Sequence, residues 1–123
     1  MLKSKRILII DDEEGFLALL RQALEERGFE VATALNAVDA GIEIATNLPV
    51  LILMDIKMPG IDGFQACEAI KQNPNTKGVP IIIISALSDD SDIHKAKKIG
   101  IADYFVKPVD IERLINRIRT IIP

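Results

Sequence analysis

Five polar residues with the chemistry to hold a cation or a phosphate follow short apolar runs of the chain. They are Asp11 and Asp12 after RILII, Asp55 after VLILM, Ser85 at the end of PIIIIS, and Lys107 after DYFV. Any one of them could simply be a helix cap or a turn residue. Taken together, three acids, a hydroxyl and an ammonium group at four expected strand ends predict one shared crevice.

Three carboxylates in one crevice need a compensating positive charge. At a separation of about 4 Å and an effective dielectric constant near ~20, each pair of carboxylates repels by about 4 kcal/mol. A hard divalent cation, Mg²⁺ or Mn²⁺, held by few protein oxygens with room for water and phosphate oxygens, would offset this repulsion. Lys107 adds a compact positive charge. In such surroundings Asp55 could act as a nucleophile toward phosphorus.

Short apolar runs alternate with segments of helical periodicity along the whole chain. The runs predict five strands, at 6–10, 29–34, 50–54, 80–85 and 103–106. Apolar residues three or four positions apart predict five helices between and after them, for example at Leu17, Leu20 and Leu24. Gly28 supplies a stop for the first helix, because glycine accepts the left-handed conformation that ends many helices.

This alternation predicts an α/β domain with a parallel sheet, because each helical crossover returns the chain in the same direction. The first, third and fourth strands are continuously apolar, which is typical of central strands buried on both faces. The second strand, with Glu30 and Thr33, has the character of an edge. Numbered along the chain, the expected order is 2-1-3-4-5, which places a site at the carboxyl ends of strands 1 and 3.

Length and composition limit the classes of function. A chain of 123 residues is the size of one domain. Its net charge of −3 offers no excess of cations for phosphates, so no direct nucleic-acid ligand is expected. The apolar runs are too short to span a membrane. A single cysteine, Cys67, and the lack of a signal-peptide pattern make the cytoplasm the expected location.

In their sequence context these residues resemble the receiver domain of two-component response regulators. The resemblance rests on ILIIDDE, LILMDIKMPGIDGF, IIIISA and DYFVKP with family-like spacing, and it covers essentially the whole chain, 1–123, as a single receiver domain. It implies a flavodoxin-like fold, in which five helices flank a doubly wound, five-stranded parallel sheet. It also suggests a cis peptide bond between Lys107 and Pro108.

The resemblance implies how the carboxylates share the work. Asp55 would accept a phosphoryl group from the phosphohistidine of a histidine kinase or histidine phosphotransfer protein. Asp12, Asp55 and the backbone carbonyl of Lys57 would bind the metal ion directly, and Asp11 would act through water. Such a domain is not expected to be an enzyme for other substrates, since it catalyses only its own phosphorylation and dephosphorylation.

The resemblance also implies how a phosphoryl group would be held and sensed. Ser85 would hydrogen-bond one phosphoryl oxygen, and Lys107 would neutralise another. Ser85 and Tyr104 would then act as a switch, although Tyr104 could equally be an edge-strand residue that packs beside the fourth helix. The output face would comprise the helix around 93–99, the strand 103–106 and the last helix, and would control a downstream protein or output domain.

The lifetime of the phosphorylated state depends on two positions that vary in the family, here Lys57 and Leu87. Neither side chain offers an acceptor that could orient an attacking water molecule. We therefore predict a phosphorylated state that is long-lived for a receiver.

Three alternatives remain open at this stage. A phosphatase of the haloacid dehalogenase type would need a second acid two residues after Asp55, where this chain has Lys57. A flavodoxin would need a first loop that cradles phosphate, whereas DDEEG would repel one. A degenerate receiver could serve only as an interaction module, but the complete polar set argues against it. A free-standing relay protein and a receiver joined to other domains are both compatible with the sequence.

Overall fold

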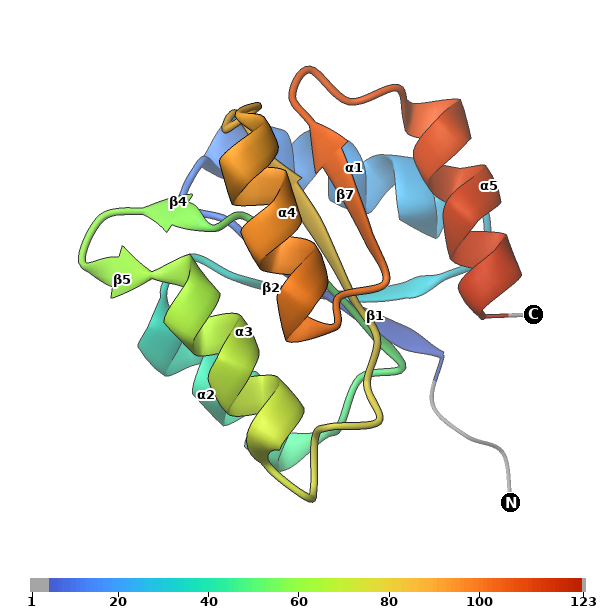
Figure 1. Ribbon diagram of the computed structural model, residues 1–123. Coiled ribbons are helices and arrows are strands. Elements are labelled where there is room, and N and C mark those ends of the chain that lie inside the picture. The colour runs from blue at the N-terminus through green and yellow to red at the C-terminus, as the bar shows by residue number, and fades with distance from the viewer. Residues whose placement is uncertain (1–4, 123) are drawn as a thin grey trace.

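The computed structural model describes residues 5–122, which form a five-stranded parallel sheet with helices on both faces (Figure 1). The strands are β1 (Arg6–Ile10), β2 (Glu30–Ala34), β3 (Leu51–Met54), β6 (Ile81–Ser85) and β7 (Asp103–Val106). Their order across the sheet is β2-β1-β3-β6-β7, and every neighbouring pair is parallel. The predicted order 2-1-3-4-5, the flavodoxin-like fold and the edge position of the second strand are confirmed.

Five helices flank the sheet, as predicted. They are α1 (Glu14–Glu25), α2 (Ala37–Thr46), α3 (Gly63–Gln72), α4 (Asp90–Ile99) and α5 (Ile111–Ile121). Helices α1 and α5 contribute to one apolar cluster, and α2, α3 and α4 contribute to a second cluster on the other face. The domain therefore has two apolar layers with the sheet between them.

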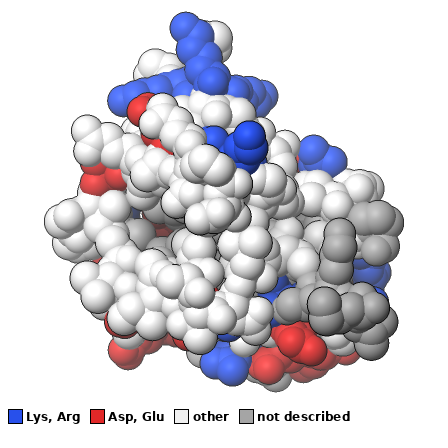
Figure 2. All heavy atoms as spheres, turned by 90° about the horizontal axis from the view of Figure 1, so that it is seen from below, with Lys and Arg blue, Asp and Glu red and all other residues white. Residues whose placement is uncertain are grey.

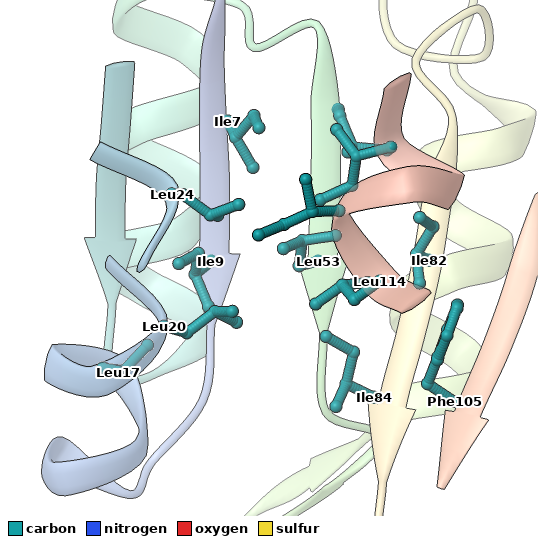
Figure 3. Packing of buried hydrophobic residues seen from close by; sticks show 13 residues of the cluster. Ile7, Ile9, Leu17, Leu20, Leu24, Leu53, Ile82, Ile84, Phe105 and Leu114 are labelled. Carbon is teal, nitrogen blue, oxygen red and sulfur yellow. The ribbon is translucent and has the colours of Figure 1, made fainter. Parts of the chain in front are cut away.

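Successive residues of the central strands supply both apolar layers. In β1, Ile7 and Ile9 join the cluster under α1 and α5, whereas Leu8 and Ile10 join the cluster under the other three helices. Figure 3 shows the first cluster, in which side chains from β1, β3, β6 and β7 meet those of α1 and α5. Burial on both faces is the reason why these strands are continuously apolar rather than alternating.

The register of β1 and β3 determines which residues emerge together at the edge of the sheet. Ile10 pairs with Met54, the last residue of β3. Asp11 and Asp55 therefore leave adjacent strands at the same level, and the backbone N–H of Asp55 donates to the carbonyl oxygen of Ile10 at 3.0 Å. A shift of one residue in this pairing would turn one of the two carboxylates toward the opposite face.

A short antiparallel hairpin after β3 is the main feature that the sequence analysis did not predict. Strands β4 (Lys57–Met58) and β5 (Ile61–Asp62) pair across a turn at Pro59 and Gly60, where Gly60 has a φ of +73°. Strands of two residues are too short to show a periodic pattern in the sequence. Strands β2, β3 and β6 each begin one residue later than predicted.

Asp62 marks the start of α3, and Gly28 marks the end of α1. The Asp62 carboxylate accepts hydrogen bonds from the backbone N–H groups of Phe64 and Gln65, at 3.0 and 3.2 Å, and so caps the start of α3. Gly28 follows α1 with a φ of +90°, and its N–H donates to the carbonyl oxygen of Glu25 at 3.0 Å. The predicted helix stop at Gly28 is therefore confirmed.

The face of the molecule away from the carboxyl ends of the strands carries few charged side chains (Figure 2). The carboxyl ends of the strands lie toward the top of Figure 1, and the view from below in Figure 2 shows a largely uncharged surface with Lys and Arg gathered along its upper edge. Val38 and Ile42 of α2 and the nearby Leu48 are among the exposed large apolar residues. Within residues 5–122, no helix combines the length and apolar character needed to cross a membrane.

Gly63 lets α3 begin in direct contact with the backbone that follows Asp55. A Cβ atom at Gly63 would lie 2.3 Å from the Cα atom and 2.5 Å from the carbonyl oxygen of Ile56. Both neighbouring atoms belong to the main chain, so neither can move aside by a change of rotamer. The start of α3 is therefore compatible only with a residue that has no side chain.

Replacement of Gly63 by alanine should destabilise the domain by roughly 1–3 kcal/mol, the usual range for an overpacked site. Urea unfolding followed by circular dichroism measures the effect. The matched control is Gly41→Ala in α2, where a Cβ would meet nothing within 4 Å. This control should stabilise the domain by about 0.5–1 kcal/mol, because alanine favours the helix. Equal effects of the two substitutions would contradict the steric argument.

Candidate functional site

Three carboxylates converge at the carboxyl edge of the sheet. Asp11, Asp12 and Asp55 each offer one oxygen, and these oxygens all lie within 4.8 Å of one another. Asp11 and Asp55 are buried, whereas Asp12 is exposed. The predicted crevice is therefore present, and it arises from the matched ends of β1 and β3.

Lys107 reaches this cluster from the end of β7. Ser85 of β6 pairs with Val106, the last residue of β7, so Lys107 leaves the sheet at the same edge. Its ammonium Nζ donates to Asp11 Oδ2 at 2.8 Å and to Asp55 Oδ2 at 3.1 Å. The peptide bond between Lys107 and Pro108 is cis, as the family resemblance suggested.

The two buried carboxylates are held in the same way. Asp11 Oδ1 accepts the backbone N–H of Glu13 at 2.9 Å, and Asp55 Oδ1 accepts the backbone N–H of Lys57 at 2.8 Å. The second oxygen of each carboxylate accepts from Lys107. Each side chain is thus fixed by one main-chain donor and one cationic donor, which satisfies a buried charge far better than a single contact would.

The ionisation of Lys107 and Asp11 reflects this arrangement. Burial alone would lower the pKa of Lys107, but its hydrogen bonds to Asp11, Glu13 and Asp55 outweigh burial and raise that pKa above the usual value. Burial raises the pKa of Asp11, in spite of the opposing hydrogen bonds from Lys107 and the Glu13 backbone. Lys107 therefore stays protonated at neutral pH, and a further cation would stabilise the negative charge of Asp11.

The donor set of the cluster fits a hard divalent cation. All three side chains offer oxygen, which is the ligand type of Mg²⁺ and Mn²⁺. The Asp12 carboxylate is exposed and accepts no hydrogen bond from another residue of the range 5–122, so its oxygens are available to an ion and to water. The predicted part of the Lys57 backbone carbonyl in binding such an ion stays a prediction.

Ser85 and Tyr104 are joined through the backbone of Leu87 rather than to the carboxylates. Ser85 Oγ accepts the Leu87 N–H at 3.2 Å, and the Tyr104 hydroxyl donates to the Leu87 carbonyl oxygen at 2.7 Å. Ser85 is fully buried, and the ring of Tyr104 packs against the cluster under α2, α3 and α4. Burial raises the pKa of the Tyr104 phenol. The two predicted switch residues thus bond the N–H and the C=O group of the same residue, Leu87.

Two residues in contact with Lys107 were missed by the sequence analysis. Glu13 Oε1 accepts from Lys107 Nζ at 3.1 Å, and the ring centroid of Phe16 lies 4.4 Å from the same nitrogen. The third acid of the DDEE run signals Glu13, because it directly follows the paired aspartates. Phe16 carries no such signal, since an aromatic residue in an amphipathic helix usually belongs to the core.

Cys67 lies outside the site and is fully buried. Burial raises the pKa of its thiol to about 12, so this cysteine is a core residue with little tendency to form the reactive thiolate.

Comparisons with known proteins agree with this geometry. The model of the response regulator receiver domain family matches residues 7–119. The chain is 37% identical over 118 residues to response regulator PleD of Caulobacter vibrioides. This match covers 96% of this chain and 26% of PleD. It is also 36% identical over 117 residues to protein PilH of Pseudomonas aeruginosa. This second match covers 95% of this chain and 97% of PilH. The chain therefore spans about a quarter of PleD and nearly all of PilH.

A solved structure extends the likeness to three dimensions. The signal receiver domain of a response regulator from Bermanella marisrubri superposes with a TM-score of 0.90 at 32% sequence identity, and the match covers 98% of this chain and 100% of that one. The family model spans most of the chain, and the paired carboxylates with their lysine lie where the sheet order reverses. The chain belongs to the receiver domain family of two-component response regulators.

Proposed function

We propose that Asp55 accepts a phosphoryl group from the phosphohistidine of a histidine kinase or histidine phosphotransfer protein. The observation that carries this proposal is the shared ammonium group: Lys107 bonds both Asp55 and Asp11 in a buried position beside the exposed Asp12. A buried carboxylate with a cation on one oxygen and open acidic ligands next to it is suited to meet an incoming dianion. Burial of these charges costs desolvation free energy, and a hydrophobic cluster of the same size would stabilise the fold as well or better. The cluster is therefore better explained by function than by stability.

In the proposed transfer, an oxygen of Asp55 attacks phosphorus while the bond from phosphorus to the donor imidazole nitrogen breaks. The electron pair of the broken bond stays on the imidazole. Lys57 N–H and Lys107 fix the orientation of the Asp55 carboxylate, and Lys107 offers its charge to the phosphoryl oxygens as they arrive. The chain thus supplies position and charge neutralisation, which is most of what phosphoryl transfer requires.

Asp11, Asp12 and Asp55 would hold a divalent cation, with the Lys57 carbonyl as a further ligand. When bound, such an ion supplies charge neutralisation for both the carboxylates and the phosphoryl oxygens. The raised pKa of Asp11, which burial causes in spite of Lys107, and the open carboxylate of Asp12 support this assignment.

Ser85 and Tyr104 are proposed to report the phosphorylated state. Ser85 accepts the Leu87 N–H, and its O–H group, which lies beside the Tyr104 hydroxyl, could donate to a phosphoryl oxygen instead. Movement of Ser85 and Leu87 toward the phosphoryl group would break the bond from Tyr104 to Leu87. This would shift the equilibrium of α4, β7 and α5, the face proposed to control a partner or an output domain.

We do not propose that the chain is a phosphatase for other substrates. That chemistry needs a general acid and base close to Asp55, and the side chain two residues on is the exposed ammonium of Lys57. Catalysis is proposed to be limited to the domain's own phosphorylation and dephosphorylation.

Addition of Mg²⁺ should raise the thermal unfolding midpoint, because the ion binds the folded cluster and not the unfolded chain. At one hundred times its Kd, the ion would add about 2.7 kcal/mol. Asp12→Asn should abolish the shift but cost the ion-free protein little, since this carboxylate is exposed and free of hydrogen bonds within the described part of the chain. The control Asp39→Asn, on α2, should keep the full shift. An unchanged shift in Asp12→Asn would contradict the metal assignment.

Incubation with acetyl phosphate and Mg²⁺ should add the mass of one phosphoryl group, which hydroxylamine should remove because the product is an acyl phosphate. Intact-mass spectrometry measures both steps. Asp55→Asn should take up no phosphoryl group, whereas Asp39→Asn should react like the original chain. Labelling of Asp55→Asn to the same extent as the original chain would contradict the proposal.

The phosphorylated domain should lose its phosphoryl group over minutes or longer, because neither Lys57 nor Leu87 offers a side-chain acceptor to orient water. Phosphate release from the purified, labelled domain in Mg²⁺ measures this lifetime. Leu87→Glu introduces such an acceptor and should shorten it, while Leu87→Met should not. Complete loss from the original chain within seconds would show that another group orients the water.

A further inference from the structure

The ammonium group of Lys107 is fully committed in the described structure. A lysine ammonium has three N–H donors, and here they serve Asp11 at 2.8 Å, Asp55 at 3.1 Å and Glu13 at 3.1 Å. The ring of Phe16 lies 4.4 Å from the same nitrogen, within the range of a cation–π contact. Any new acceptor for Lys107 must therefore displace one of these three carboxylates.

The three ion pairs differ greatly in their exposure to solvent. The side chains of Asp11 and Asp55 are 2% and 5% exposed, whereas that of Glu13 is 64% exposed. An ion pair open to water is weak, because water solvates both partners well when they separate. A carboxylate that is buried and loses its partner pays a large cost. The bond to Glu13 is therefore the one that Lys107 can release most easily.

We propose that Glu13 is an exchangeable partner of Lys107 that competes with the phosphoryl group, and that Phe16 is a positioning residue that keeps the ammonium group at the site in both states. This inference rests on the proposed function of Asp55. It assigns opposite effects to two neighbours of the same lysine.

The ion pair between Glu13 and Lys107 lasts only as long as no stronger anion binds the Lys107 ammonium group. A phosphoryl group on Asp55 would take the third donor of Lys107, and the released Glu13 carboxylate would return to water. The same carboxylate also repels the phosphoryl dianion over a short distance. Both effects act in one direction, so Glu13 lowers the affinity of the site for a phosphoryl group.

Phe16 acts through a contact that no anion can replace. Its ring is uncharged and partly buried, and it packs against the apolar cluster under α1 and α5, which fixes its position. The face of the ring attracts the ammonium group whichever carboxylate or phosphate the ammonium bonds. Phe16 therefore limits the volume that the long Lys107 side chain can explore and keeps Nζ close to Asp55.

Beryllofluoride, which mimics a phosphoryl group on a carboxylate, tests the role of Glu13. Affinity is measured by titration at saturating Mg²⁺, so that differences in metal binding do not enter. Glu13→Gln should bind beryllofluoride more tightly, by up to about fivefold. The matched control is Glu14→Gln, which removes the same charge one residue further along and has no ion pair among the described residues. Equal affinities of the two variants would overturn the role of Glu13.

The role of Phe16 is tested by a pair of variants and a second measurement. Phe16→Leu should weaken beryllofluoride binding by about two- to fivefold, and Phe16→Tyr should restore it. In the metal-free protein, the ring should move the NMR resonances of the Lys107 ε-methylene protons upfield, an effect lost in Phe16→Leu and kept in Phe16→Tyr. Unchanged Lys107 resonances in metal-free, folded Phe16→Leu would show that the ring does not lie over the Lys107 side chain, and that result would overturn the assignment.

The outcomes separate this inference from the proposed function. If the original chain binds no beryllofluoride, the proposed function fails and the competition by Glu13 fails with it. If the original chain binds beryllofluoride but the Glu13 and Phe16 variants bind equally well, only the division of roles is wrong. Circular dichroism of each variant confirms that the comparison is made between folded proteins.

Discussion

The whole arrangement depends on one ammonium group between two buried carboxylates. Asp11 and Asp55 leave adjacent strands at the same level, and without Lys107 their charges would face each other in a poorly solvated place. The pKa shifts show that the compensation is incomplete: Lys107 holds its proton strongly, while burial still disfavours the charge of Asp11. The site is therefore stable enough to form and still short of positive charge, which suits it to bind a cation.

Most of this arrangement can be predicted from the spacing of apolar and polar residues in the sequence. Continuous apolar runs separated by helical segments require a parallel sheet covered on both faces, and such a sheet brings all strand ends to one edge. The strand order and the convergence of the three aspartates with Lys107 were predicted correctly for this reason. The bonds from Lys107 to Asp11 and Glu13 were not predicted, because they depend on rotamers rather than on strand position.

The features that escaped prediction are those with no periodic signal. Strands β4 and β5 have two residues each, and their pairing is determined by a turn and by the burial of Met58 rather than by a repeat. Phe16 looks like an ordinary member of an amphipathic helix, and the only signal for Glu13 is its place after the paired aspartates. The fold shows that both residues contact Lys107, which follows β7. The link from Ser85 to Tyr104 runs through the main chain of Leu87, where side-chain identity carries no information.

The two sides of the crevice around Asp55 differ in stiffness. The contact between Gly63 and Ile56 makes one side stiff, and the segment after β6 forms the more compliant side. On the stiff side, the start of α3 lies against the main chain and the Cβ atom of Ile56, directly after Asp55, and a change of rotamer moves none of these atoms. On the compliant side, the segment after β6 is held through hydrogen bonds at the N–H and C=O groups of Leu87, and such bonds can be exchanged for others when the segment moves. A charge that arrives at Asp55 would therefore move the segment after β6 and not the start of α3. The rigid contact at Gly63 would thus determine which side of the crevice responds.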